Sequence, residues 1–194
     1  ILSGQHDEMV KPVMDLFELK EDINLNILKR SISLDQSISL ILSDLSQFFD
    51  IQKPDIVFVQ GDTITAFAGA LASFFKKIPV AHVEAGLRTK SIYSPFPEEA
   101  NRRMISQITS WHFPPTKVAF ENLRNNGIYK DVFISGNTVV DALNFASKKI
   151  NYSHIKNINI YKESYILITV HRRENWVEPI RNIAKGISNI ASKN

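Results

Sequence analysis

Three acidic residues stand where this sequence could carry out chemistry: Asp62, Glu84 and Glu98. Asp62 follows the apolar run 56–60 and a glycine, Glu84 ends the next apolar run, and Glu98 opens a segment of helical pattern. Carboxylates at the ends of parallel strands point into the crevice where open α/β sheets bind their ligands. Such a group of carboxylates predicts acid–base chemistry on a bound ligand.

Local explanations compete with this prediction for the first two acids. Asp62 could cap a helix that begins at Thr63, a role that stabilises a helix by about 1 kcal/mol. Glu84 could form a salt bridge with Arg88, although a carboxylate that ends an apolar strand must lie near the sheet edge. The equivalent placement of two acids in successive strand–helix units favours the functional interpretation.

Glu98 has a structural explanation of its own. The helix dipole favours acids in a first turn, and Arg102 and Arg103 follow one turn later, where they can pair with Glu98 or Glu99. On local grounds alone, this structural interpretation is the stronger one.

A basic cluster, His171-Arg172-Arg173-Glu174, lies between a later apolar run and a helical pattern. Imidazole, guanidinium and free backbone N–H groups would converge there on an anion such as a diphosphate. The alternative is a salt-bridge cluster between domains. We select His171 and Arg172 as the candidate anion ligands.

Several polar residues occupy turns or strands without a distinctive pattern. Asn137 either caps a helix or lines the crevice at the carboxyl ends of the strands. Gln5 and His6 lie in a strand-to-helix turn, where capping is the commoner role. His82 and His112 fall within strand patterns and are predicted to be structural.

The composition narrows the class of protein. The chain has 194 residues, 23 basic and 20 acidic, with scattered lysines, so no nucleic-acid partner is predicted. No cysteine, metal-ligand spacing, glycine-rich phosphate loop or membrane-spanning run occurs, and the default is a soluble cytoplasmic protein without a metal. Both ends of the sequence look cut.

Apolar runs alternate with helical patterns, which predicts an α/β fold with a doubly wound parallel sheet. We expect a Rossmann-like domain over residues 1–150, a linker over 151–163, and the opening of a second such domain over 164–194. The predicted helices are Asp7–Phe17, Leu34–Phe49, Thr63–Phe75, Glu98–Ile108, Lys117–Asn125, Val139–Lys149 and Glu178–Ala191. The predicted strands are Leu25–Leu28, Asp55–Gln60, Val80–Glu84, Trp111–Phe113, Val132–Ile134 and Tyr165–Val170.

Taken in order, eight motifs of this sequence resemble the bacterial non-hydrolysing UDP-N-acetylglucosamine 2-epimerases. The motifs are Gly4-Gln5-His6, Lys53-Pro54-Asp55, Gly61-Asp62-Thr63, His82 to Thr89, Tyr93 to Glu99, Asn101-Arg102-Arg103, Gly136-Asn137-Thr138 with Asp141-Ala142-Leu143, and His171 to Asn175. Each motif alone could be chance, whereas the ordered set is specific.

The resemblance implies a GT-B-like two-domain fold with the nucleotide sugar in its cleft. It also implies interconversion of UDP-GlcNAc and UDP-ManNAc, by anti elimination of UDP to 2-acetamidoglucal and re-addition, for bacterial surface polysaccharide. A carboxylate would remove the C2 proton, another would return one on the opposite face, and a cationic cluster would stabilise departing UDP. The family needs no redox cofactor or metal, and forms homodimers.

Position by position, the resemblance makes Asp62, Glu84 and Glu98 catalytic acids and His171 the histidine near the diphosphate. Arg88, Asn137 and Arg172 would contact substrate. Gln5 and His6 would belong to an allosteric site for a second UDP-GlcNAc. The family's opening Gly-Thr-Arg-Pro-Glu loop and most of its second domain have no counterpart here, so the 194-residue chain is expected to be inactive alone.

Three other functions remain open at this stage. A hydrolysing 2-epimerase would release free ManNAc and UDP. A GT-B glycosyltransferase would need no pair of acids around C2. A non-catalytic nucleotide-sugar-binding protein would keep the cleft without the chemistry.

Overall fold

The computed structural model describes residues 1–4, 7–27, 32–149, 166, 168–170 and 178–192. The chain divides into two compact units, Ile1–Ile150 and Asn151–Asn194, which are described separately. Within the described segments, no helix is long and apolar enough to cross a lipid bilayer.

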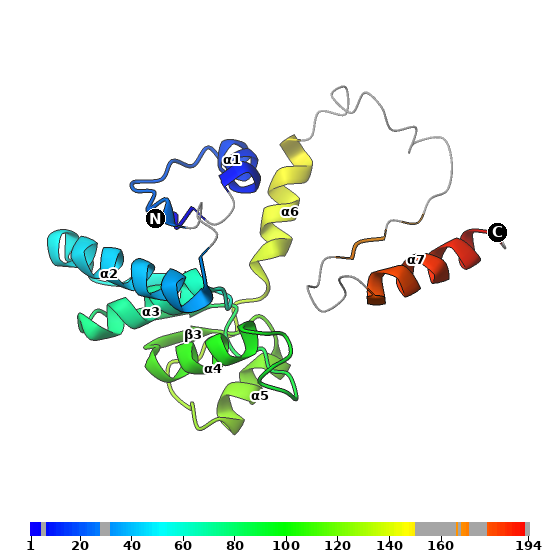
Figure 1. Ribbon diagram of the computed structural model, residues 1–194. Helices are drawn as coiled ribbons and strands as arrows, with labels where there is room; N and C mark the ends of the chain where they lie inside the picture. The colour runs from blue at the N-terminus through cyan, green and yellow to red at the C-terminus, as the bar shows by residue number, and fades with distance from the viewer. Residues whose placement is uncertain (5–6, 28–31, 150–165, 167, 171–177, 193–194) are drawn as a thin grey trace. The chain divides into compact units, whose positions relative to one another are not determined.

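The first unit alternates strands and helices as the sequence predicts (Figure 1). Helix α2 continues past Phe49, and Lys53 ends it in a left-handed conformation, with φ of 46°. In chain order the elements are α1 (Asp7–Leu16), α2 (Leu34–Gln52), β1 (Val57–Gln60), α3 (Ile64–Phe75), β2 (Val80–Val83), α4 (Glu98–Ile108), β3 (Trp111–Phe113), α5 (Lys117–Asn125) and α6 (Thr138–Lys149). In the second unit, the helix α7 (Glu178–Ala191) coincides with its predicted range.

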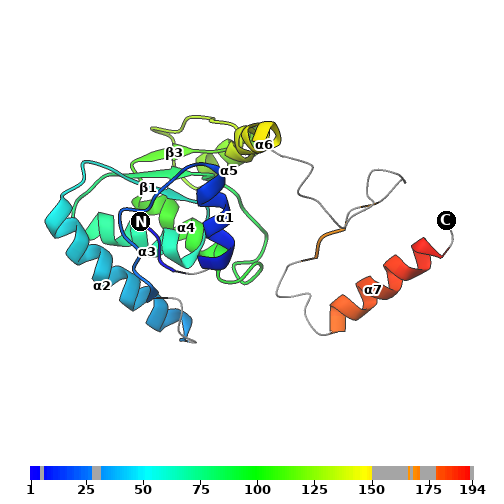
Figure 2. The ribbon, with the colours of Figure 1, turned by 90° about the horizontal axis from the view of Figure 1, so that it is seen from above.

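The three strands form a parallel sheet in the order β1-β2-β3, which confirms the predicted α/β class. Val59 pairs with His82, and His82 pairs with His112 on the next strand. Because the strands are parallel, their carboxyl ends meet at one edge of the sheet. The connections that leave β1 and β2 at this edge carry the three candidate acids (Figures 1 and 2).

Helix α3 packs between the sheet and its neighbouring helices, α2 and α4. Its sequence is apolar on nearly every side, as expected for a helix that is covered on several faces. Ala68 and Ala72 join the core formed with α2, whereas Ala66 and Ala70 join the core formed with Val59. Small side chains on both faces let α3 approach α2 and the sheet closely, which fixes the start of α3 relative to the strands.

Three predicted strands are not formed as expected. Asn24 makes one parallel bridge to Leu2, and Val132 makes one to His112, where continuous strands were predicted over Leu25–Leu28 and Val132–Ile134. Main-chain hydrogen bonds flank both bridges, such as Leu25 N–H to Leu2 O at 2.8 Å and Phe133 N–H to His112 O at 2.9 Å, but the described residues of these segments form no continuous strand. Phe133 and Ile134 are more than half exposed. Residues 166 and 168–170, the described part of the predicted strand Tyr165–Val170, have no strand structure, and Tyr165 and Leu167 lie outside the described residues.

Candidate active site

Asp62 lies in the turn between β1 and α3. Gly61 adopts φ of 69°, and its N–H donates to Val83 O at 3.0 Å, so the turn follows directly from the β1–β2 pairing. The N-cap of α3 is Thr63, whose side-chain oxygen accepts from Ala66 N–H at 3.2 Å. The capping explanation for Asp62 is therefore wrong, because the next residue fills that role.

Helix α4 holds the Asp62 turn through two side chains. Asn101 donates from Nδ2 to Asp62 O at 2.9 Å. Arg102 Nε lies 3.4 Å from Asp62 Oδ2, with the Arg102 side chain 9% exposed and that of Asp62 26% exposed. These contacts bring the first turn of α4, which begins with Glu98, against the turn that carries Asp62.

Glu84 follows the last residue of β2 and has a left-handed backbone, with φ of 64°. Its carboxylate lies over the Asp62 turn, because a Cβ added to Gly61 would lie 3.9 Å from Glu84 Oε2. In the described part of the chain Glu84 forms no ion pair, so the predicted salt bridge with Arg88 is not formed. A glutamate in this conformation is uncommon and carries a backbone cost of roughly 1–2 kcal/mol.

The two arginines of α4 pair with Glu99 and not with Glu98. Glu99 is fully buried, with Oε1 2.6 Å from Arg103 Nε and Oε2 3.1 Å from Arg102 Nε. Glu98 is half-buried and has no ion pair among the described residues. The structural explanation of Glu98 as a partner of these arginines is thus contradicted, since its neighbour takes both.

Glu99 also anchors the loop that precedes α4. Its Oε2 accepts from Thr89 N–H at 3.1 Å, and Arg103 donates to Thr89 O at 3.1 Å. Thr89 Oγ1 lies 2.7 Å from Ser94 O, to which it donates, so the loop is closed on itself. The i,i+3 spacing of Glu99 and Arg102 predicts that they pair, but it does not predict that Glu99 anchors this loop.

Arg88 lies next to this network and contacts α4. Its guanidinium donates to Ser106 Oγ at 3.1 Å and to Leu87 O at 2.8 Å. Burial lowers the pKa of Arg88; the charge of Glu99 opposes this shift, and Arg103 and Arg102 add to it. A cation at this place contributes positive potential to the region around the acids.

His82 and His112 are buried neighbours on β2 and β3, as predicted for structural residues. His82 Nε2 forms a hydrogen bond with Gly61 O at 2.8 Å, which supports the Asp62 turn. Burial lowers the pKa of both from 6.5 to about 4. Each Nδ1 lacks a hydrogen-bond partner within the described residues.

The remaining candidates fall into two groups. Asn137 is exposed, and its Oδ1 accepts from Val139 N–H at 3.0 Å, so the helix-capping role is filled at the start of α6. The other four candidates, Gln5, His6, His171 and Arg172, lie outside the described residues.

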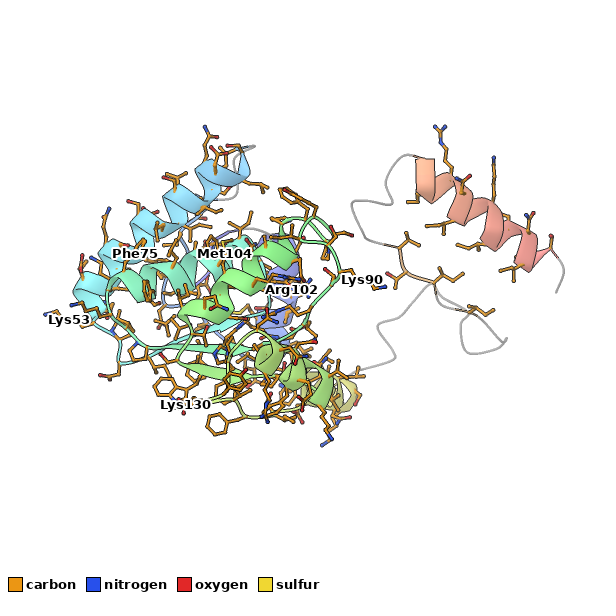
Figure 3. All side chains as sticks on the ribbon, turned by 90° about the horizontal axis from the view of Figure 1, so that it is seen from below. Lys53, Phe75, Lys90, Arg102, Met104 and Lys130 are labelled. Carbon is orange, nitrogen blue, oxygen red and sulfur yellow. The ribbon has the colours of Figure 1, made fainter. Side chains whose placement is uncertain are left out.

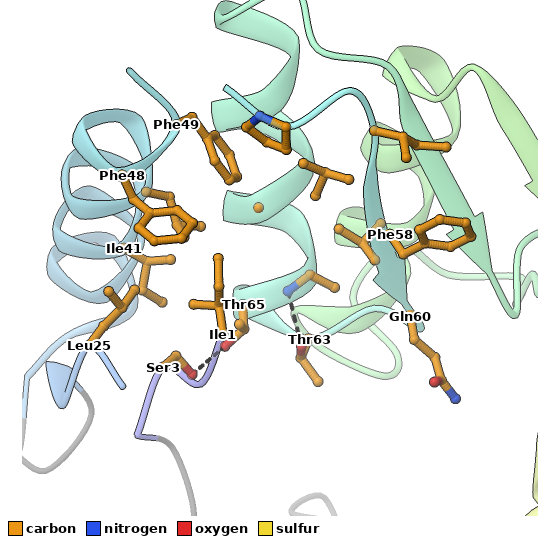
Figure 4. Close-up of a pocket in the computed structure, with 17 residues that line it drawn as sticks. Ile1, Ser3, Leu25, Ile41, Phe48, Phe49, Phe58, Gln60, Thr63 and Thr65 are labelled. Atoms are coloured by element: carbon orange, nitrogen blue, oxygen red, sulfur yellow. Dashed lines mark hydrogen bonds between the residues drawn. The ribbon is translucent and has the colours of Figure 1, made fainter. Parts of the chain in front are cut away.

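A cavity of about 390 Å³ is lined by residues of α2, β1, α3 and the start of the chain (Figure 4). Phe48, Phe58 and Ile41 are among its lining side chains, and a hydrogen bond of 2.8 Å joins Ser3 and Thr65 at its rim. None of the three acids lines it, and its lining residues include no Asp, Glu or His. We therefore place the candidate active site at the acids.

Asp62, after β1, is paired with the buried Arg102 (labelled in Figure 3). Glu84, after β2, and Glu98, the first residue of α4, have no ion pair among the described residues. In the described part of the chain, no three His, Asp or Glu side chains gather as they would around a metal ion.

Sequence comparison gives the family of the chain. The model for UDP-N-acetylglucosamine 2-epimerase matches residues 1–194. The chain belongs to the UDP-N-acetylglucosamine 2-epimerase family. It is 46% identical to the UDP-N-acetylglucosamine 2-epimerase of Neisseria meningitidis, over 99% of this chain and 54% of that protein. With the Bacillus subtilis enzyme it shares 45% identity, over 99% of the chain and 50% of the relative.

Solved structures of the family have the same fold. The N. meningitidis epimerase bound to UDP-GlcNAc superimposes with a TM-score of 0.89 at 46% identity, over 97% of this chain and 53% of that structure. The Methanocaldococcus jannaschii epimerase in complex with UDP-GlcNAc and UDP gives 0.81 at 37% identity, over 92% and 50%. The chain thus spans about half the length of the relatives it matches.

Proposed function

We propose that the complete protein interconverts UDP-GlcNAc and UDP-ManNAc, with the site built around Asp62, Glu84 and Glu98. One observation carries this proposal: Glu99 pairs with both Arg102 and Arg103, and among the described residues Glu98 and Glu84 have no ion pair. The names of the relatives supply the substrate class, since two of the similar structures are complexes with UDP-GlcNAc.

The reaction divides into two balanced steps. In the first, a carboxylate takes the proton from sugar C2, the C1–O bond breaks, and UDP departs with the bonding electrons, leaving 2-acetamidoglucal. In the second, a proton returns to C2 on the opposite face while a UDP oxygen attacks C1. Glu84 and Glu98 fit the two proton transfers, because each is a carboxylate without a neutralising partner in the described part.

The proposal extends to residues that the described structure does not include. His171 and Arg172 would stabilise the departing diphosphate from a second domain that opens at 164–194. Gln5 and His6 would hold a second UDP-GlcNAc, and the complete protein would be a homodimer. The cytoplasmic location, the absence of a cofactor and the service to surface polysaccharide remain predictions.

The test is isotope incorporation in deuterated water, using a chain that includes the rest of the second domain. We expect deuterium at C2 of both UDP-sugars, with UDP still attached. Glu84→Gln and Glu98→Gln should each reduce turnover by about 100-fold or more while UDP-GlcNAc still binds. Glu121→Gln is the matched control, because Glu121 is an exposed acid on α5.

The outcome also separates the competing functions. Free ManNAc as the main product would favour a hydrolysing 2-epimerase. Binding of UDP-GlcNAc without exchange in the unmodified protein would favour a non-catalytic sensor.

A further inference from the structure

We propose that Arg102 is a positioning residue of this site: its guanidinium, shared between Asp62 and Glu99, fixes the Asp62 carboxylate and ties its turn to helix α4. The inference deepens the proposed function and rests on it for its activity test. Its structural test stands independently of any activity.

The position of the guanidinium supports this role. Arg102 Nε lies 3.1 Å from Glu99 Oε2 and 3.4 Å from Asp62 Oδ2, and the side chain is 9% exposed. Nε has no hydrogen bond of good geometry to either acid, so it is held between them by charge. Arg102 therefore joins an acid at the end of β1 to a fully buried acid of α4.

The contact constrains Asp62 relative to helix α4. Asn101, the residue before Arg102, already binds the main chain of Asp62 from α4. Arg102 in addition pairs with the side chain of Asp62, and this ion pair restricts rotation of the Asp62 carboxylate. Glu98 begins the same helix, so these two contacts help to set the place of Asp62 relative to the start of α4.

Lysine cannot reproduce the arrangement. A guanidinium is planar and presents several N–H donors, so one side chain can face two acids, whereas an ammonium is a compact point charge. In the Arg102→Lys variant, a cation remains near the buried Glu99, so the fold should be retained. The ion pair with Asp62 should be weakened.

Arg103 provides a matched control on the same helix. Its Nε pairs with the same Glu99 at 2.6 Å, and its guanidinium donates to Thr89 O, which lies in the loop before α4. Its side chain is 40% exposed. A purely structural role for the Glu99 cluster predicts equal effects at the two arginines, whereas positioning of Asp62 predicts an effect of Arg102 alone on turnover.

The first experiment is a double-mutant cycle of thermal stability on the 194-residue chain. The variants are Asp62→Asn, Arg102→Lys and the double substitution. We expect the double variant to lose less than the sum of the single losses, by about 3 °C or more in melting temperature. Additive losses would overturn the proposed contact, whatever the activity of the protein.

The second experiment measures C2 deuterium exchange in a chain that includes the rest of the second domain. Arg102→Lys should lower kcat by about 100-fold while KM for UDP-GlcNAc changes by less than about 3-fold. Arg103→Lys should stay within about 3-fold of the unmodified protein in both constants. Adding Arg102→Lys to Asp62→Asn should cause no further loss, because Arg102 acts through Asp62.

Equal losses of kcat in the Arg102 and Arg103 variants, or an unchanged Arg102→Lys enzyme, would refute the positioning role. If the unmodified protein does not exchange C2 at all, the proposed epimerase function fails, and the stability cycle still decides the Arg102–Asp62 contact.

Discussion

At the scale of single residues, Glu84 shows most clearly a backbone conformation that its residue type disfavours. Its φ of 64° is a conformation that glycine adopts easily and glutamate rarely does. The position follows β2 directly and directs the carboxylate over Gly61, beside Asp62. Backbone strain of this kind is typical of functional sites, where the side chain is retained for its chemistry.

Glu84→Gly should therefore stabilise the 194-residue chain by about 1 kcal/mol, because glycine removes the steric cost of the left-handed backbone. Glu84→Ala is the control, since it also removes the carboxylate but keeps Cβ. Urea denaturation of both variants decides the point. Equal stabilities would show that the backbone at Glu84 is not strained. In the complete protein, both variants should lose C2 exchange.

At the scale of elements, the turn after β2 and helix α5 depend on each other. Gly86 has φ of 87°, and a Cβ there would collide with Ala119 O and lie 3.0 Å from Leu123 Cγ. Asn122 of α5 donates from Nδ2 to Gly86 O at 3.0 Å, so the helix rests on the main chain of this turn. The close approach of α5 thus helps to fix the backbone that presents Glu84.

Gly86→Ala should cost about 3 kcal/mol or more, because it combines an unfavourable φ with a clash against helix backbone. Gly127 is the matched control: its φ is 82°, but a Cβ there would have no heavy atom within 4 Å. Gly127→Ala should cost only about 1 kcal/mol. Urea denaturation followed by circular dichroism measures both. Similar losses would mean that the approach of α5 does not constrain the turn.

At the scale of the whole molecule, the buried histidines make stability depend on pH. His82 and His112 have pKa values near 4 in the folded chain, against 6.5 as the ordinary value. The unfolded chain therefore binds more protons between these values, and the free energy of unfolding falls as pH decreases from about 6.5 towards 4. Above pH 6.5 their contribution is constant.

Between pH 7 and pH 5 each histidine should reduce the free energy of unfolding by about 2 kcal/mol. Urea denaturation across this range measures the slope. His112→Gln removes one of the two titrating groups, so its slope should be about half that of the unmodified chain. A slope unchanged by this substitution would contradict the assignment of the pH dependence to His112.

The 194-residue chain alone should show no C2 epimerisation. It spans about half the length of the relatives it matches, and the predicted second domain is represented by residues 164–194, too few to bury a core. The candidate diphosphate ligands His171 and Arg172 belong to that part. Mass spectrometry after incubation with UDP-GlcNAc in deuterated water would detect exchange, and any exchange would refute this expectation.

Much of the fold could be predicted from the sequence, because apolar runs and helical periods are local signals. The ranges of α4, β3, α5 and α7 agree with their predictions. The described residues near Leu25 and Val132 form single bridges flanked by a few main-chain hydrogen bonds, since a continuous strand requires regular pairing with its neighbour over several residues. Apolar composition alone does not reveal that partner.

The sequence by itself determined the family and the order of strands and helices, since ordered motifs and periodicity are properties of the chain. Only the tertiary structure decided which acids are neutralised. Thr63 caps α3 in place of Asp62, and Glu99, facing the interior, takes Arg102 and Arg103. The physical reason is that ion pairing depends on which side of a helix turn is buried, which neighbouring elements set. The sequence spacing allows either Glu98 or Glu99 to pair with Arg102 and Arg103. Packing buries Glu99 beside both arginines, and Glu98 has no ion pair among the described residues.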